Sequence, residues 1–302
     1  MGAMERRGFE LALLGVLAVL WGSSFAFIHL GVQGFGPLTF IGLRCAIAAV
    51  VLYLVMRLRG ITMPRDAASW RAFGIQASLA TVTPFLLIAW GSQEVASALA
   101  VVLASTSPIF AFLLGFLFRR AEPPGWRKGL GVTLGIAGVA AIVGHQGLGG
   151  GSLWHMLAIV FSGALFALSG YTGLSNFQDK DPIVPALGAQ CVGLCVLLPL
   201  GALVEAPWNA TPSASAWFGL FGLALFSTAA ASVIWFRLLR TLGVVATTSQ
   251  AYLRVPIGAA IGVFLLGEAF PWAAVAGTAL VMVGVALMTL RPRPAPPIPS
   301  RN

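Results

Sequence analysis

The chain has 302 residues, of which 58% are hydrophobic and only 9% are charged, against roughly 25% charged residues in an average soluble domain. This composition excludes a soluble globular fold and predicts an all-α polytopic membrane protein, because helices satisfy their own backbone hydrogen bonds inside a hydrocarbon layer. The net charge of +9 does not indicate a nucleic-acid partner, since the basic residues fall in short segments between apolar runs.

Apolar runs separated by charged, Gly or Pro breaks predict ten membrane-spanning helices. Each run has roughly 20 residues, which at about 1.5 Å per residue is long enough to cross a hydrocarbon layer of about 30 Å. The expected spans are about 9–30, 37–57, 70–90, 96–118, 125–144, 152–172, 183–203, 215–237, 243–266 and 272–290.

The basic residues follow a pattern that sets the expected orientation. Sixteen of the 18 Lys and Arg residues lie before the first expected span, at the ends of the even-numbered spans, or after the last span. Cytoplasmic connections are enriched in Lys and Arg, so we expect both termini in the cytoplasm of a cell with the protein in its inner (plasma) membrane. A miscounted span would remove this asymmetry, which therefore also supports the count of ten.

An internal repeat relates the two parts of the chain. The run 243–270 has a counterpart 148 positions earlier, in which Ala98, Pro108, Ile109, Ala111, Phe116 and Leu117 match Ala246, Pro256, Ile257, Ala259, Phe264 and Leu265. Five spans separate the copies, and this odd number requires the copies to run in opposite directions. We expect inverted five-helix repeats at 9–144 and 152–290, followed by a disordered cytoplasmic tail at 291–302.

Both copies of the repeat carry a proline near the middle, Pro108 in the first and Pro256 in the second. Proline removes a backbone donor and breaks a helix, which a membrane protein tolerates where the freed backbone lines a cavity. Matched interrupted spans are a pointer to a transporter's binding site. We therefore expect a helix break at each of these prolines, beside a central cavity.

Several motifs occur in a fixed order along the chain: Trp21–Phe25, Leu43–Arg44, the runs 98–111 and 129–140, and the Gly267–Glu268 turn followed by 284–286. Their order and spacing resemble the EamA-type branch of the drug/metabolite transporter superfamily. The first half departs from that pattern at 119–122, where the family usually has Gly-Glu. The resemblance implies ten helices, a central cavity and export of small metabolites.

Away from the span ends, two charged residues, Arg44 and Arg254, lie inside the expected spans. Arg254 is about eleven residues into the ninth span, where an unpaired arginine costs at least about 2.5–3.5 kcal/mol, so it must face protein or water. No mid-span Asp or Glu is available to pair with it. It receives a carboxylate or phosphate of a ligand, which we favour, or it bonds carbonyls freed at Pro256 or the side chain of Gln250. We interpret Arg44 as structural, with a side chain that snorkels toward the outer surface.

Aromatic and polar residues in the spans are further candidates for a ligand cavity. Stacking walls are expected from Trp21, Tyr171, Trp235 and Tyr252, and hydrogen bonds from Ser24, Thr81, Ser105 and Gln250. The alternative is structural, because Ser and Thr also join helices to one another and Trp and Tyr also anchor span ends at the membrane interface.

The sequence contains no arrangement typical of an enzyme, a metal site or a bound cofactor. Cys191 and Cys195 share a helix face, but no nearby His, Asp or Glu completes a metal site. The histidines lie near span ends, apart from any catalytic partner. The expected partners are a small-molecule substrate and the lipid bilayer, and a monomer is favoured.

The predicted function is export of small metabolites by alternating access around a central cavity. Amino acids or related carboxylated compounds are the first choice, from Arg254 and the resemblance. Aromatic or amphipathic drugs are the alternative, from the aromatic content. An intramembrane enzyme or a channel is disfavoured, because neither a catalytic cluster nor a charged ring or filter-like loop is seen.

Overall fold

The computed structural model describes residues 3–117, 126–148, 153–177, 179–242, 247 and 250–289. These residues form helices joined by short connections, with no strand among them. The expected tail at 291–302 and residues 149–152, where the repeats connect, lie outside the described residues. The all-helical character expected from the composition is confirmed for the described part of the chain.

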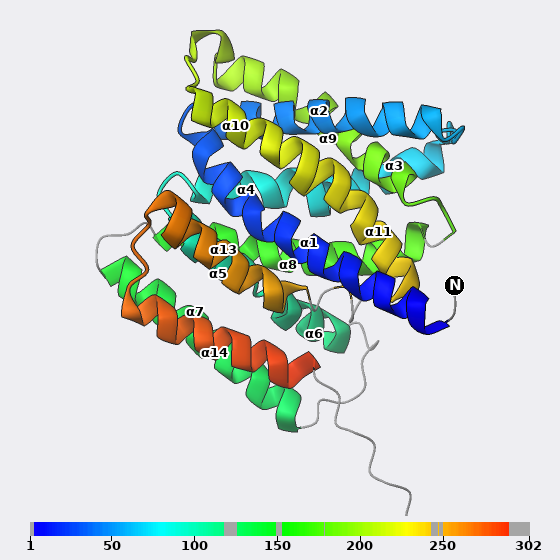
Figure 1. Cartoon of the computed structure of the whole chain (residues 1–302). Coiled ribbons are helices and arrows are strands. Elements are labelled where there is room, and N and C mark those ends of the chain that lie inside the picture. The colour runs from blue at the N-terminus through cyan, green and yellow to red at the C-terminus, as the bar shows by residue number, and fades with distance from the viewer. Residues whose placement is uncertain are drawn as a thin grey trace, which may run out of the picture.

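The helices lie side by side across the molecule (Figure 1). Their bounds are α1 Ala3–Val32, α2 Pro37–Leu58, α3 Ala67–Ala77, α4 Thr83–Gly91, α5 Ser97–Ala104, α6 Ser107–Leu117, α7 Trp126–Leu148, α8 Leu153–Phe177, α9 Ile183–Val204, α10 Ala214–Gly222, α11 Ala231–Thr241, α13 Ala251–Leu266 and α14 Trp272–Thr289. A short 3₁₀ turn, η2, covers Pro207–Asn209.

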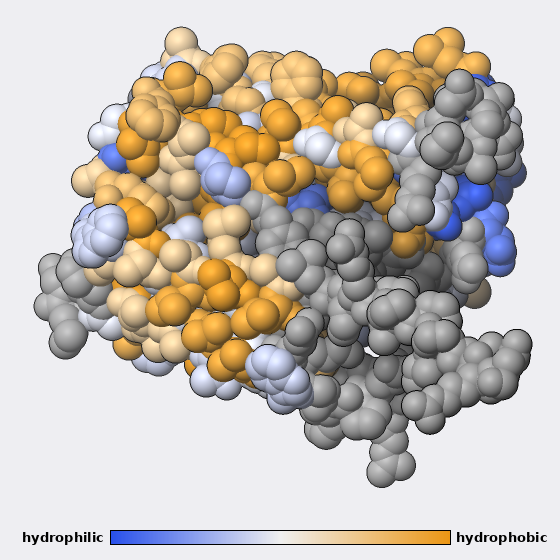
Figure 2. Space-filling view, turned by 60° about the horizontal axis from the view of Figure 1, so that its bottom comes forward, coloured by the Kyte–Doolittle hydropathy of each residue, from blue (hydrophilic) through white to orange (hydrophobic). Residues whose placement is uncertain are grey.

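Within the described residues, seven helical segments are long and apolar enough to cross a membrane. They are Gly8–Val32, Pro37–Leu58, Ala67–Gly91, Ser97–Gly115, Leu153–Phe177, Ile183–Val204 and Ala214–Thr241, and shorter apolar helices cover Gly129–Gly144, Leu253–Leu266 and Trp272–Gly284. Hydrophobic residues cover most of the coloured part of the face in Figure 2, and the hydrophilic ones gather mainly at its right-hand edge. This surface is that of a multi-pass membrane protein.

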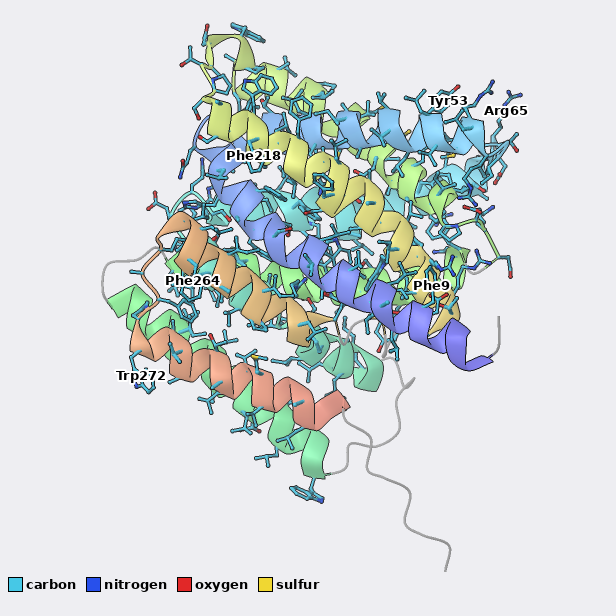
Figure 3. The ribbon with its side chains drawn as sticks, viewed as in Figure 1. Phe9, Tyr53, Arg65, Phe218, Phe264 and Trp272 are labelled. Atoms are coloured by element: carbon cyan, nitrogen blue, oxygen red, sulfur yellow. The ribbon has the colours of Figure 1, made fainter. Side chains whose placement is uncertain are left out.

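Successive long helices run between two ends of the bundle. Phe9, Tyr53 and Arg65 lie at one end, and Phe218, Phe264 and Trp272 lie at the other (Figure 3). We call the first the basic end, because the described connection 59–66 and the last turns of α2 and α11 place arginines there. The opposite end carries the connections 33–36, 92–96, 205–213 and 267–271.

Helices far apart in the sequence form the closest pairs of the bundle: α7 packs along α14, α2 along α9 and α1 along α13. Glycines make this approach possible. A Cβ on Gly138 would lie 2.6 Å from the Gly277 carbonyl oxygen, and one on Gly258 would lie 2.8 Å from the Gly22 carbonyl oxygen. Small residues of this kind allow helix backbones to come into direct contact in membranes.

Three of the long segments depart from regular α-helix in the middle. A π-helical segment, η1 (Ser78–Val82), separates α3 from α4, and a second, η3 (Leu223–Ala230), separates α10 from α11. The third departure is the gap at Ser105–Thr106 between α5 and α6. These irregular segments lie at the depth where the structure forms a cavity, as is common for π-bulges at functional sites.

The two prolines of the repeat behave differently. Before Pro108 the helix is interrupted: α5 ends at Ala104, whose carbonyl would have accepted the N–H that Pro108 lacks. The expected break at Pro256 is wrong, since Pro256 lies inside the continuous helix α13. A membrane helix tolerates one missing backbone bond, and α1 packs closely on α13 nearby, where a Cβ on Gly22 would lie 3.1 Å from the Arg254 carbonyl oxygen.

Candidate functional site

A cavity of about 1130 Å³, counted with its opening to solvent, lies between helices drawn from most of the chain. Among the described residues of its wall, two are arginines, Arg44 and Arg254, and none is acidic. The polar remainder of the wall is uncharged and comprises Ser24, Gln76, Thr81, Ser107, Ser169, Gln190, Ser227, Thr228, Ser232 and Gln250. The cavity therefore presents fixed positive charge without a compensating carboxylate.

The cavity occupies the middle of the bundle and extends toward the basic end. In its wall, Ala186 lies in the first turn of α9, Phe236 lies in the last two turns of α11, and Gln250 lies directly before α13. Toward the opposite end the space is filled by a buried apolar cluster that includes Phe35 and Phe40. Access from that side is therefore closed by packed side chains.

Arg254 is held beside the break that Pro108 creates. Its Nη2 donates to Ser105 Oγ at 2.8 Å and to the freed carbonyl of Ala104 at 3.3 Å. Its Nε is buried without a partner, and its guanidinium carbon lies 5.7 Å from the centre of the Phe25 ring. The side chain is only 7% exposed. One edge of the guanidinium is thus fixed by the protein, and donors remain for a ligand.

The groups that Arg254 contacts do not depend on it. The Ala104 carbonyl also accepts from Ser107 Oγ at 3.0 Å, and Ser105 Oγ donates to the Val101 carbonyl at 2.6 Å. If the guanidinium served only to satisfy freed carbonyls, those carbonyls would be expected to have no other hydrogen-bond donor. This redundancy favours a role for Arg254 in binding an anion over a role in backbone capping.

Gln250 lies one turn before Arg254 and lines the same cavity. Its Oε1 is buried without a hydrogen-bond partner, so Gln250 does not pair with the guanidinium as one of the sequence-based alternatives proposed. Gln190 Oε1 and Thr228 Oγ1, also in the wall, are buried and unpartnered in the same way. Unsatisfied buried polar atoms are rare in folded proteins, and a cavity that carries several is suited to a polar ligand.

Arg44 is placed differently from the sequence-based expectation. It is 1% exposed, its Nη2 donates to the Thr81 carbonyl in η1 at 2.9 Å, and its guanidinium carbon lies 3.8 Å from the centre of the Phe85 ring. The expected snorkelling to the surface is therefore wrong. The π-helical segment offers a carbonyl and Phe85 offers a ring face inside the bundle, and both are favourable partners for a guanidinium.

Aromatic side chains form the apolar part of the wall. Trp21 and Trp235, both expected at the site, contact each other with ring centroids 5.0 Å apart. Phe85 and Phe166 make a second pair at 5.7 Å. Such a wall can bury the apolar portion of a ligand while the polar atoms fix its orientation.

The other predicted residues are distributed as follows. Ser24, Thr81 and Pro108 line the cavity. Ser105 is not among the lining residues, but its hydroxyl accepts a hydrogen bond from Arg254, which is one of them. Tyr171 is not among the lining residues, and its hydroxyl donates to the Ala111 carbonyl at 2.9 Å. The side chain of Tyr252 lies outside the described residues.

Sequence reasoning missed seven polar residues of the wall: Gln76, Ser107, Ser169, Gln190, Ser227, Thr228 and Ser232. The two glutamines could have been found, because an amide inside an apolar span is expensive unless it has a partner or a cavity. Thr228 and Ser232 carry no comparable signal, since hydroxyl residues are common along the same spans and the π-helical segment that turns Thr228 inward is not encoded by any proline.

Comparisons with known proteins agree with this architecture. The model of the EamA-like transporter family matches twice, at residues 9–144 and 149–290. A solved crystal structure superposes with a TM-score of 0.60 at 19% identity, covering 92% of this chain and 96% of the other, and so shares the fold.

Curated relatives match over nearly the whole chain. The uncharacterized inner membrane transporter YedA of Escherichia coli K12 is 27% identical over 92% of this chain and 89% of its own. A probable terminal-alkyne amino-acid exporter of Streptantibioticus cattleyicolor is 27% identical over 92% of both chains. The uncharacterized transporter YoaV of Bacillus subtilis is 25% identical over 92% of this chain and 96% of its own. With both matches of the family model spanning most of its length, the chain belongs to the EamA-like transporter family.

Proposed function

We propose that this membrane transporter exports small carboxylated metabolites, amino acids among them, by alternating access around the cavity described above. Arg254 receives the carboxylate, and the Trp21–Trp235 pair contacts the apolar portion of the substrate. The observation that carries the proposal is a buried guanidinium that lines a cavity without acidic residues and whose protein contacts all have other partners. The name of the Streptantibioticus relative supports amino acids as the first class to examine.

A thermal-shift screen tests this substrate class. Purified protein is heated with amino acids, organic anions and nucleotides, and each compound is compared with an uncharged derivative of the same shape. A ligand that binds only the folded state stabilises it, by about 2.7 kcal/mol when the ligand is present at a hundred times its Kd. This stabilisation is seen as a higher unfolding temperature. Stabilisation by carboxylated compounds and not by their amides supports the proposal, and stabilisation by neither contradicts it.

A second candidate, export of aromatic or amphipathic drugs, is favoured by the aromatic wall of Trp21, Phe85, Phe166 and Trp235. The two candidates differ in their dependence on charge. Neutral aromatic compounds would stabilise the parent protein and the Arg254→Ala variant equally if this second candidate were correct.

We further propose ten spans in two inverted five-helix halves, 9–144 and 152–290, with both termini in the cytoplasm of an inner-membrane protein. The arginines at the basic end support this orientation, and the three shorter apolar helices complete the count.

The topology predicts opposite accessibility of two positions. A single cysteine placed in the 147–151 connection should react with an impermeant thiol reagent in intact cells, because that connection faces outside. A reporter fused after Asn302 should be active in the cytoplasm. If the 147–151 cysteine reacts only after lysis, the ten-span topology and the inverted repeat are both wrong.

A further inference from the structure

At the opposite end of the bundle, Glu268 binds the start of α5. Its Oε1 accepts the Ser97 N–H at 2.7 Å, and its Oε2 accepts the Ala98 N–H at 2.8 Å and the Ser97 hydroxyl at 2.9 Å. The residue before α5, Ala96, has no side chain that could cap the helix. The first N–H groups of a helix lack partners within the helix, and here a carboxylate from a distant segment supplies them.

The backbone around Glu268 explains its placement. Gly267 has a left-handed φ of 68°, and the Glu268 N–H returns to the Gly262 carbonyl at 3.0 Å, which ends α13 in a Schellman-like turn. A Cβ on Gly262 would overlap the Glu268 carboxylate. The turn at Gly267 therefore directs the Glu268 side chain toward α5, and the missing Cβ of Gly262 leaves space for its carboxylate.

Glu205 makes the same arrangement with α2. Its Oε1 accepts the Leu38 N–H at 2.8 Å and its Oε2 accepts the Thr39 N–H at 2.7 Å. Gly36, before α2, has no side chain to cap the helix, and a Cβ there would overlap the Glu205 carboxyl group. Glu205 itself follows the end of α9, just as Glu268 follows the end of α13.

The Glu205 and Glu268 contacts join the same two halves of the chain, and in both the carboxylate comes from the second half. In each, a carboxylate from the second family match, 149–290, binds the N-terminus of a helix from the first match, 9–144. Carboxylates are favourable at helix N-termini, and hydrogen bonds to a charged acceptor are roughly twice as strong as neutral ones. Both contacts lie at the end where the apolar cluster closes the cavity.

We propose that Glu205 and Glu268 are positioning residues of the transport cycle, which hold the opposite end of the bundle closed and must release α2 and α5 before the cavity opens there. The inference rests on the alternating access proposed above. Links between the halves at the basic end, within the described residues, are ion pairs between side chains. Arg59 and Asp181 lie 3.0 Å apart with side chains 49% and 30% exposed, and Arg237 and Glu10 lie 2.7 Å apart with side chains 47% and 11% exposed.

Labelling of a cavity cysteine tests the proposal. Cys45, Cys191 and Cys195 are replaced by alanine, and Ser232→Cys places a reporter in the cavity wall. With impermeant maleimide outside intact cells, the Glu205→Gln, Glu268→Gln double variant should react about tenfold faster than the parent, because loss of both charge-assisted contacts shifts the closed–open equilibrium. Unchanged outside labelling overturns the proposal. The labelling needs no substrate. Its outcome therefore does not depend on whether the proposed carboxylated substrates are correct.

A carboxylate of the same type at the other end provides the control. Asp66 Oδ1 caps α3 by accepting the Ser69 N–H at 2.8 Å, and this hydrogen bond holds the pKa of Asp66 below its usual range. Asp66→Asn weakens a helix cap but touches nothing at the opposite end, so outside labelling should equal that of the parent. If Asp66→Asn raises outside labelling as much as the double variant does, capping in general and not the two proposed contacts is responsible, and the proposal is wrong.

A reversible cross-link provides a second test that does not rely on weakening the fold. A Cβ on Gly201 would lie 3.0 Å from the Thr39 N and 3.2 Å from the Thr39 Cα, so α2 and α9 must separate by a few tenths of an ångström to admit Gly201→Cys. Thr39→Cys and Gly201→Cys are then within reach of a disulfide between the two helices. The oxidised pair should lose transport while substrate added from the basic side still stabilises the protein, and reductant should restore transport. Full transport by the cross-linked protein overturns the proposal, and the two single-cysteine variants control for the substitutions.

Discussion

Arg254→Ala is expected to lower the transport rate of a carboxylated substrate about a hundredfold, because the substrate loses a charge-assisted contact inside the cavity. The unfolding temperature should stay close to that of the parent. The Ala104 carbonyl keeps its bond from Ser107 Oγ, and Ser105 Oγ keeps its bond to the Val101 carbonyl, so no buried acceptor is left unpaired. Uptake into liposomes and thermal unfolding of the same preparations measure the two effects.

Arg254→Lys is the matched control for charge. It keeps the sign of the charge but replaces the planar fork with a single ammonium group, so transport should be partly retained. Substrate should raise the unfolding temperature of the parent and the lysine variant but not that of the alanine variant. An alanine variant that unfolds early and is still stabilised by substrate to the parent's extent would assign Arg254 to structure.

Arg44→Ala is expected to act on stability instead, lowering the free energy of unfolding by about 3 kcal/mol. The substitution removes a fully buried side chain, its bond to the Thr81 carbonyl and its contact with the Phe85 ring. Arg57→Ala, an exposed arginine on the same helix, should change stability little. Chemical or thermal unfolding in detergent measures both variants.

The opposite result for Arg44 would be informative. If Arg44→Ala unfolds like the parent but is no longer stabilised by substrate, Arg44 is a second group that binds the anion. The structural interpretation would then be wrong, and the cavity would have two positions for negatively charged oxygen atoms.

Much of the fold follows from the sequence because a membrane allows few solutions. Apolar runs must be helices, and the bounds of α2, α9 and α14 lie within a few residues of the runs 37–57, 183–203 and 272–290. Helix irregularity is harder to predict. Pro108 produces a break and Pro256 does not, and η3 forms without any proline. These differences depend on packing between distant helices, which no local pattern records.

The candidate site was predictable where a residue is costly in the membrane. Arg254 stands out as a charge at mid-span, and the structure places it in the cavity wall. The direction of the Arg44 side chain, into the bundle, was not predictable, because it depends on a carbonyl in η1 and on the position of Phe85. The pairing of Glu205 with α2 also depends on tertiary structure, since 166 positions separate the carboxylate from Thr39.

Counterflow in liposomes that contain the purified protein tests the central claim most directly. Liposomes are loaded with an unlabelled amino acid and diluted into a trace of the same compound in labelled form, and the experiment is repeated with its carboxamide. Transient accumulation of the amino acid is expected, with none of the carboxamide and none of either compound with Arg254→Ala. Equal accumulation of the carboxamide, or accumulation of the amino acid that survives Arg254→Ala, would contradict the proposed function.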